Sequence, residues 1–284
     1  MSILFRDRRS TKGSAVVVMA AITACVTSSN VAAKHAVQEF VREQHIVMVH
    51  GVEEQWQLVW TGKPSRVCGP QEVYMAVTCP CYGFAYGEYG KLSLVRKLGG
   101  REVERMDLRP LFGHFDYPEA QMVEGTAYVQ RWPTQSDDLA REEHGDSKLV
   151  SEILHRQPTS IMHFEDYDQD GNATEFLLQV GVLPCGKQQF AAIGVSAKND
   201  HLHAVTSVAK TNQPLLMPNQ AWDALLKGGP DTRSVLVWQC GDHGSEVRSE
   251  LVVNAKNGDI QVTARDFSCP IDGSKAKLVS EHAN

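Results

Sequence analysis

The sequence has no apolar run long enough to form a membrane-spanning helix. Its longest run, residues 15–26, covers about a dozen residues, whereas a spanning helix needs about 20. Basic residues are not in excess either, because 28 lysines and arginines stand against 34 aspartates and glutamates, for a formal net charge of -6. This balance gives no electrostatic reason to expect a nucleic acid as a partner.

The common catalytic signatures are also missing. We find no G-x-S-x-G, H-E-x-x-H, Walker loop or dinucleotide-binding fingerprint, and no repeat with a period of 20–50 residues. What remains is ordinary for a globular protein: 284 residues, of which 42% are apolar and 22% charged. The length allows one large domain or two small ones. The sequence alone therefore does not indicate a reaction.

The first 33 residues have the three parts of a secretory signal peptide. Basic residues come first, the apolar run follows, and the polar stretch 27–30 leads into Val31-Ala32-Ala33. Cleavage after Ala33 fits the Val-x-Ala pattern. Residues 22–25, Ile-Thr-Ala-Cys, also resemble the lipobox of bacterial lipoproteins, which would remove 1–24 and lipidate Cys25. Both alternatives predict an exported protein (periplasmic, envelope-anchored or extracellular) whose membrane contact is limited to the signal peptide or lipid anchor.

Six cysteines follow the predicted export signal, and an even number in an oxidising compartment indicates up to three disulfides. Cys79 and Cys81 are too close to pair comfortably, so each is expected to reach a distant partner. Cys240 and Cys269 end two strand-like runs, 234–240 and 260–268, and are candidates to join across a meander. A redox or zinc site is disfavoured because Cys79-Pro80-Cys81 is not a C-x-x-C pair. The disulfide candidates are Cys68, Cys79, Cys81, Cys185, Cys240 and Cys269.

Short alternating or apolar runs bounded by turn residues dominate the rest of the chain. They predict a mainly β fold with two or three short helices and sandwich-like antiparallel sheets. Gly99-Gly100 and Asn257-Gly258 mark tight hairpin turns. The strands are expected near 55–60, 73–78, 91–98, 102–108, 161–165, 175–182, 190–195, 202–208, 234–239, 250–255 and 260–265.

Two segments have helical patterns, and one between them suggests a boundary. Residues 148–156 are expected to bury Leu149, Val150, Ile153 and Leu154 on one face, and 219–227 should end at Gly228-Gly229. Residues 113–146 are rich in turn formers and charge. We therefore expect β-rich lobes at 34–112 and 147–284 with a loop or junction at 113–146, or one continuous domain.

One acidic motif stands out. The segment 166–175, Asp-Tyr-Asp-Gln-Asp-Gly-Asn-Ala-Thr-Glu, has carboxylates at positions 1, 3 and 5 and a glycine at position 6. Calcium takes six to eight oxygen ligands, and this spacing wraps three carboxylates around one point. The predicted Ca²⁺ ligands are Asp166, Asp168, Asp170, the carbonyl of Asn172, Thr174 through a water, and Glu175.

This motif resembles the D-x-D-x-D-G loop shared by EF-hands, dockerins and integrin-type FG-GAP repeats. The resemblance covers about a dozen residues and implies a calcium site, not a fold. An EF-hand has a bidentate acid at position 12, where this chain has Leu177, and FG-GAP loops prefer an acid at position 9, where it has Thr174. Glu175 at position 10 either substitutes or points away. The missing final carboxylate predicts a weak, structural site with a dissociation constant of about 10⁻⁴–10⁻³ M.

A wider resemblance and one alternative complete the expectations. Residues 79–84, 174–179 and 240–244 resemble segments of uncharacterised secreted proteins of environmental bacteria, and that resemblance implies no activity. The favoured hypothesis is an exported, disulfide-braced, calcium-binding β protein with a binding or envelope-structural role. The alternative is an exported metal-dependent hydrolase that uses His201 and His203, which alternation places on one face of a strand. Its third ligand would be Asp200, His163 or His243.

Overall fold

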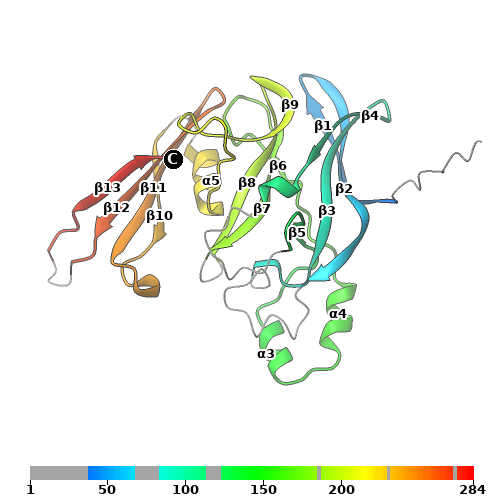
Figure 1. The fold of residues 1–284 in the computed structure, drawn as a ribbon, viewed down its shortest axis with the longest axis horizontal. Coiled ribbons are helices and arrows are strands. Elements are labelled where there is room, and N and C mark those ends of the chain that lie inside the picture. The colour runs from blue at the N-terminus through cyan, green and yellow to red at the C-terminus, as the bar shows by residue number, and fades with distance from the viewer. Residues whose placement is uncertain (1–37, 68–82, 113–122, 184–186, 229–230, 271–273) are drawn as a thin grey trace, which may run out of the picture. The chain divides into compact units, whose positions relative to one another are not determined.

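A computed structural model describes most of the chain after the predicted export signal. The described residues are 38–67, 83–112, 123–183, 187–228, 231–270 and 274–284. Residues Val37–Asn284 form one compact unit. The fold is mainly β with antiparallel sheets, as the sequence predicts, and three α-helices occur in this part of the chain (Figure 1). None of the described helices is long and apolar enough to cross a membrane.

Sheet A is a meander of four strands to which a fifth is added. Tight turns at His50-Gly51 and Gly99-Gly100, all with positive φ, close two of its hairpins. The order is β1-β2-β3-β4, and β5 pairs with β3 beyond the end of β4. The strands are β1 (Glu39–Val49), β2 (Val52–Val67), β3 (Gly87–Leu98), β4 (Arg101–Asp107) and β5 (Ala127–Gln130).

Sheet B packs against sheet A on one face and buries its other face as well. Alternate residues of β8 show this: Ala191, Ile193 and Val195 join the core shared with sheet A, whereas Ala192 joins a second core with sheet C. This two-sided burial explains the nearly continuous apolar sequence of β7 and β8. The strands are β6 (Phe164–Glu165), β7 (Glu175–Leu183), β8 (Lys187–Ser196) and β9 (Asn199–Ala204).

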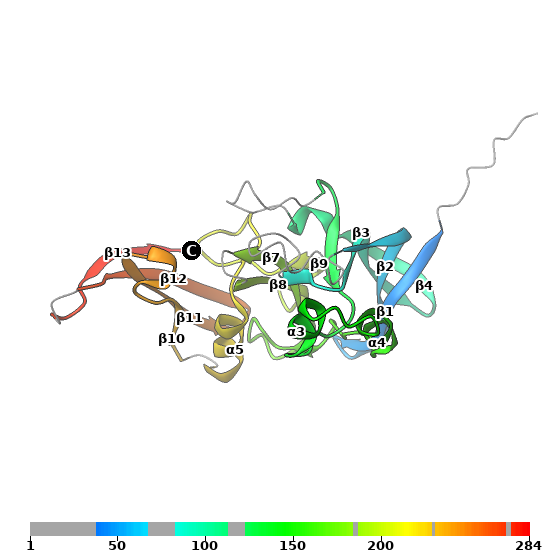
Figure 2. The same ribbon diagram turned by 90° about the horizontal axis from the view of Figure 1, so that it is seen from below.

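Sheet C and helix α5 (Asn219–Gly228) supply the other side of the second core. Trp222 of α5 is fully buried there and donates a hydrogen bond from Nε1 to the Phe190 carbonyl, 3.1 Å. Figures 1 and 2 show α5 beside β10 and β11, with which it is in contact. The strands are β10 (Arg233–Trp238), β11 (Val247–Lys256), β12 (Asp259–Ser268) and β13 (Leu278–Ala283).

The disulfide candidate pair of sheet C is confirmed. Cys240 and Cys269 are bonded, with their Cα atoms 5.6 Å apart. They follow β10 and β12, the two strands that flank β11, so the bond closes the end of this meander. The other candidates, Cys68, Cys79, Cys81 and Cys185, lie outside the described residues, as do Cys25, the signal segment and the strand expected at 73–78.

The structure differs in detail from two local predictions. Residues 113–146 are not only a loop, because β5 and helix α3 (Asp138–Glu143) lie in the described part, and β5 extends sheet A. Turn-forming residues concealed the short run Ala127–Gln130, which is stabilised by pairing with β3 rather than by its own pattern. In helix α4 (Leu149–His155), Leu149 and Ile153 are buried as expected, but Val150 is 45% exposed since only one narrow face of this short helix meets the core.

Candidate metal centre

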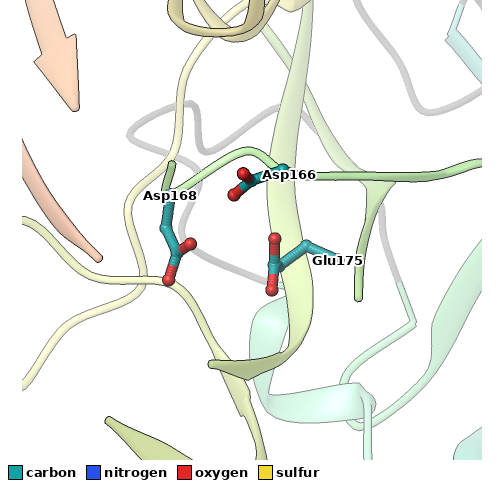
Figure 3. Close-up of side chains that lie close together, drawn as sticks. All are labelled: Asp166, Asp168 and Glu175. Atoms are coloured by element: carbon teal, nitrogen blue, oxygen red, sulfur yellow. The ribbon is translucent and has the colours of Figure 1, made fainter. Parts of the chain in front are cut away.

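The acidic segment forms the connection between β6 and β7. Asp166, Asp168 and Glu175 each place one carboxylate oxygen so that the three atoms lie within 4.8 Å of one another. Figure 3 shows the three carboxylates turned toward a common space. Two oxygens that share one calcium ion at about 2.3–2.6 Å can be at most about 5 Å apart. The spacing therefore fits a single bound cation.

The backbone of the loop is wrapped around the first carboxylate. Asp166 accepts hydrogen bonds from the amides of Asp170, 2.9 Å, and Gly171, 3.0 Å. The chain reverses through positive φ at Gln169 (58°) and Gly171 (98°). Glycine adopts this conformation without the penalty that other residues incur, so Gly171 has the turn role that the sequence assigns to it.

Asp170 holds the loop in place from outside the cluster. Its Oδ1 accepts hydrogen bonds from the backbone amide of Asn172, 2.8 Å, and from the Asn172 side chain, 2.9 Å. Its Oδ2 accepts one from the amide of Ala197, in the turn between β8 and β9. Among the described residues, the gathered ligand set omits this predicted member.

Glu175 points into the cluster. It is the first residue of β7 and 1% exposed, with Oε1 2.9 Å from the Thr174 hydroxyl and Oε2 accepting a hydrogen bond from the Tyr167 amide, 3.2 Å. The Thr174 hydroxyl also lies 2.8 Å from the Val195 carbonyl oxygen. Thr174 is therefore engaged by β8 and positions Glu175. The sequence leaves open whether Glu175, at position 10, points toward the loop or away from it. In the structure, its position at the start of β7 directs its carboxylate toward Asp166 and Asp168.

Burial and mutual repulsion raise the pKa values of two of these carboxyls. Burial and then the charge of Asp168 raise the pKa of Glu175 to about 9. Burial and then the charges of Asp170 and Asp166 raise the pKa of Asp168 to about 7. A cation at this point would remove the repulsion and favour the charged forms. The donor set consists of oxygen atoms alone, which suits hard cations such as Ca²⁺.

A turn of sheet C closes one side of the loop. The amide of Gly258 donates a hydrogen bond to the Asp168 carbonyl, and that of Asn257 donates one to the Gln169 carbonyl, both 3.0 Å. A Cβ at Gly258 would lie 3.4 Å from Asp168 Oδ2. The sequence identifies Asn257-Gly258 as a hairpin turn, and its positive φ angles confirm this. Nothing in the local pattern reveals that the turn rests on the acidic loop.

Comparisons with known proteins give no relative. No family model, curated protein or solved structure matches the chain. The resemblance of residues 166–175 to calcium loops stays a prediction.

The histidines of the alternative hypothesis lie elsewhere, on β9. His201 is exposed with Nδ1 3.3 Å from Glu104 Oε1, and His203 Nδ1 is 2.8 Å from the His201 carbonyl oxygen. Within the described ranges, the group Asp166, Asp168 and Glu175 is the one set of three or more potential metal ligands that converges. His201 and His203 belong to no such set there.

Proposed function

We propose that this is an exported, disulfide-braced β protein in which the loop 166–175 binds Ca²⁺, with a binding or envelope-structural role. The observation that carries the proposal is the convergence of Asp166, Asp168 and Glu175 within 4.8 Å in a sequence of calcium-loop type. The converging oxygens come from carboxylates that would repel one another without a cation. A bound ion offsets that repulsion.

The location of the loop favours a structural role for the ion. Its hydrogen bonds reach the β8–β9 turn through Asp170 and Ala197, and the β11–β12 turn through Gly258. The loop thus joins sheets B and C beside the core that they share. With three carboxylate ligands we expect a dissociation constant of about 0.1 mM. At about 1 mM Ca²⁺, such a site adds about 1.4 kcal/mol to the free energy of unfolding.

The test is a thermal melt of the non-reduced mature chain, in excess EDTA and in millimolar CaCl₂. We expect Ca²⁺ to raise the melting temperature of the wild type by about 3–5 °C. Asp168→Asn and Glu175→Gln preserve side-chain shape but remove a ligand charge, and should abolish this rise. The matched control is Glu165→Gln, which removes an exposed charge beside the loop and should keep the full rise.

A wild-type melting temperature that does not change with Ca²⁺ would refute the proposed structural role of the ion. So would an equal loss of the calcium response in Glu165→Gln, because a general effect of negative charge would then explain the result. Isothermal titration of the wild type with CaCl₂ gives the stoichiometry, which the proposal sets at one ion per chain for this loop.

Export is tested separately, by the mass and N-terminal sequence of the protein recovered from a bacterial host. Cleavage after Ala33 predicts a chain that begins at Lys34. Lipidation predicts a blocked chain that begins at Cys25 and loses its incorporated fatty acid in Cys25→Ser. A full-length chain that stays in the cytoplasm would refute the export proposal without affecting the calcium test.

A further inference from the structure

A second charged feature lies on sheet A, far along the sequence from the acidic loop. A hollow of about 710 Å³ is lined by four cationic side chains, Arg42, Lys63, Arg66 and Arg131, together with Glu88 and aromatic residues. Two irregularities in the strands shape it. The β1–β2 register shifts at Arg42, and the β2–β3 register shifts between Thr61 and Ser65. Such bulges re-aim side chains and are frequent beside functional sites.

The wall of the hollow has more cations than acceptors. Arg131 forms an ion pair with Glu88, 3.1 Å, and Arg42 one with Glu43, 3.5 Å. Glu43 is already occupied by hydrogen bonds from the amides of Ile161 and Met162. Lys63 and Arg66 form no ion pair with any residue that the structure describes, and both are exposed. Positive charge is therefore concentrated on one face of a chain that is negative overall.

Two buried donors in the same wall add to the shortage of acceptors. The Arg42 side chain is 3% exposed and its Nε has no hydrogen-bond partner, although its Nη2 donates to the Thr159 carbonyl. Trp60 is 1% exposed and its Nε1 likewise has no partner. Buried donors are nearly always paired in native proteins. The wall that carries four cations therefore has more hydrogen-bond donors than the described residues supply with acceptors.

Trp132 holds two of the cations in position. The guanidinium carbon atoms of Arg66 and Arg131 lie 5.7 Å and 5.4 Å from the centre of its rings. Cation–π contact fixes the guanidinium planes before a ligand arrives, which reduces the entropy lost on binding. Planar guanidinium groups bind carboxylate, sulfate and phosphate through paired hydrogen bonds. Trp132 also offers an optical signal for binding.

We propose that this hollow binds an organic polyanion of about disaccharide size that carries several carboxylate, sulfate or phosphate groups. The number and spread of the cations, from β1, β2 and the segment after β5, match several oxyanions rather than one. The volume lies in the range of small-molecule sites and far exceeds the space that one inorganic anion fills. This inference does not depend on the calcium proposal, because it rests on different residues and a different sheet.

The probes are sucrose octasulfate, digalacturonate, sucrose and inorganic sulfate, titrated into the mature chain and followed by tryptophan fluorescence and calorimetry. We expect one or both charged disaccharides to bind at least about 100-fold more tightly than inorganic sulfate, since several charge-assisted contacts act together. Their ranking distinguishes a sulfate source from a carboxylate source. Sucrose, which has no charge, should not bind detectably.

Two exposed residues allow the site to be removed without disturbing the fold. Lys63→Gln and Arg66→Gln should each weaken binding of the charged disaccharide by about tenfold, equivalent to one charge-assisted hydrogen bond. Arg101→Gln removes an exposed cation at the start of β4, outside the hollow, and should change affinity less than about twofold. Circular dichroism confirms that each variant is folded.

Four results would overturn the proposal. The first is absence of binding by both charged disaccharides in low salt. The second is equal affinity for inorganic sulfate, which would mean that one anion fills the site. The third is equal affinity for sucrose, in which case the cations have no part in recognition. The last is equal weakening in Arg101→Gln and Arg66→Gln, because the attraction would then come from the general field of the protein.

Discussion

Two clusters of charge lie between the layers of this molecule, and they differ in one respect. Between sheets A and B, Arg96 binds Glu54 through two hydrogen bonds of 2.7 Å and Glu104 through a third of 2.7 Å. Beside sheets B and C, Asp166, Asp168 and Glu175 converge, and none of them forms an ion pair with a lysine or arginine of the described residues; the nearby Lys198 pairs with Asp259 instead. The first cluster contains its own counter-ion.

The same kind of carboxyl therefore behaves in opposite ways. Burial would raise the pKa of Glu54, but hydrogen bonds from Arg96 and Trp56 hold it below its usual value. Burial and the charge of Asp168 raise the pKa of Glu175 to about 9. Glu175 is 1% exposed and Glu54 is 7% exposed, so deeper burial contributes to the higher pKa of Glu175. The nearest charge adds to the difference, because it is a cation for Glu54 and another carboxylate for Glu175.

The largest expected change in stability that tests this comparison comes from removing the cation of the cluster formed by Arg96, Glu54 and Glu104. Arg96→Met leaves Glu54 and Glu104 without their cation, and the free energy of unfolding should fall by about 3–5 kcal/mol. Glu104 also accepts a hydrogen bond from the Leu202 amide, and Arg96 donates one to the Asp200 carbonyl, so the loss extends to β9. Urea denaturation at pH 7 measures the change.

Arg105→Met is the matched control on the neighbouring strand. Arg105 pairs with Glu102 and Glu39 at the surface, where such pairs contribute at most about 1 kcal/mol. Adding Glu54→Gln and Glu104→Gln to Arg96→Met should recover part of the lost stability, because the uncompensated charges disappear. A triple variant no more stable than Arg96→Met would indicate that packing of the arginine side chain, not charge, explains the loss.

Much of the fold follows from the sequence because strand periodicity is local. The hairpin at Gly99-Gly100, the helix near 219–227 and the meander closed by Cys240 and Cys269 all follow from short-range patterns. Strand β5 was missed because its support is not local: it pairs with β3, about 40 residues away in the chain, and packs into the core. Strand β13, at Leu278–Ala283, was missed for the same reason, because it is mostly exposed and pairs with β12.

The two candidate sites also differ in whether their residues are close together in the sequence. The D-x-D-x-D-G spacing lies within ten residues, so the sequence contains the acidic loop and identifies its ligand candidates. It does not show that Asp170 faces Ala197 or that the Asn257-Gly258 turn closes the loop, since these contacts depend on how β8 and sheet C pack. The cationic hollow brings together β1, β2 and the end of β5. No local pattern could reveal that assembly.

A change of pH sharpens the comparison in the metal-free protein. The folded-state pKa values of Asp168 and Glu175, about 7 and about 9, lie above those of an unfolded chain. The folded state then holds these protons more tightly, so the stability they contribute is complete below about pH 4 and is lost as pH rises through 7 to 9. Asp166 and Asp170 oppose ionisation of Asp168, and Lys198 favours it.

In EDTA, we therefore expect the stability of the wild type to fall by several kcal/mol between pH 5 and 8, measured by urea denaturation at intervals of half a pH unit. Asp168→Asn removes one titrating group and should flatten the fall, while Glu165→Gln should leave it unchanged. Because Ca²⁺ competes with the same protons, its dissociation constant should decrease as pH rises over this range. A metal-free protein whose stability is constant from pH 5 to 8 would mean that these carboxylates are ionised without a cation. The contrast with Glu54 and Arg96 would then no longer hold.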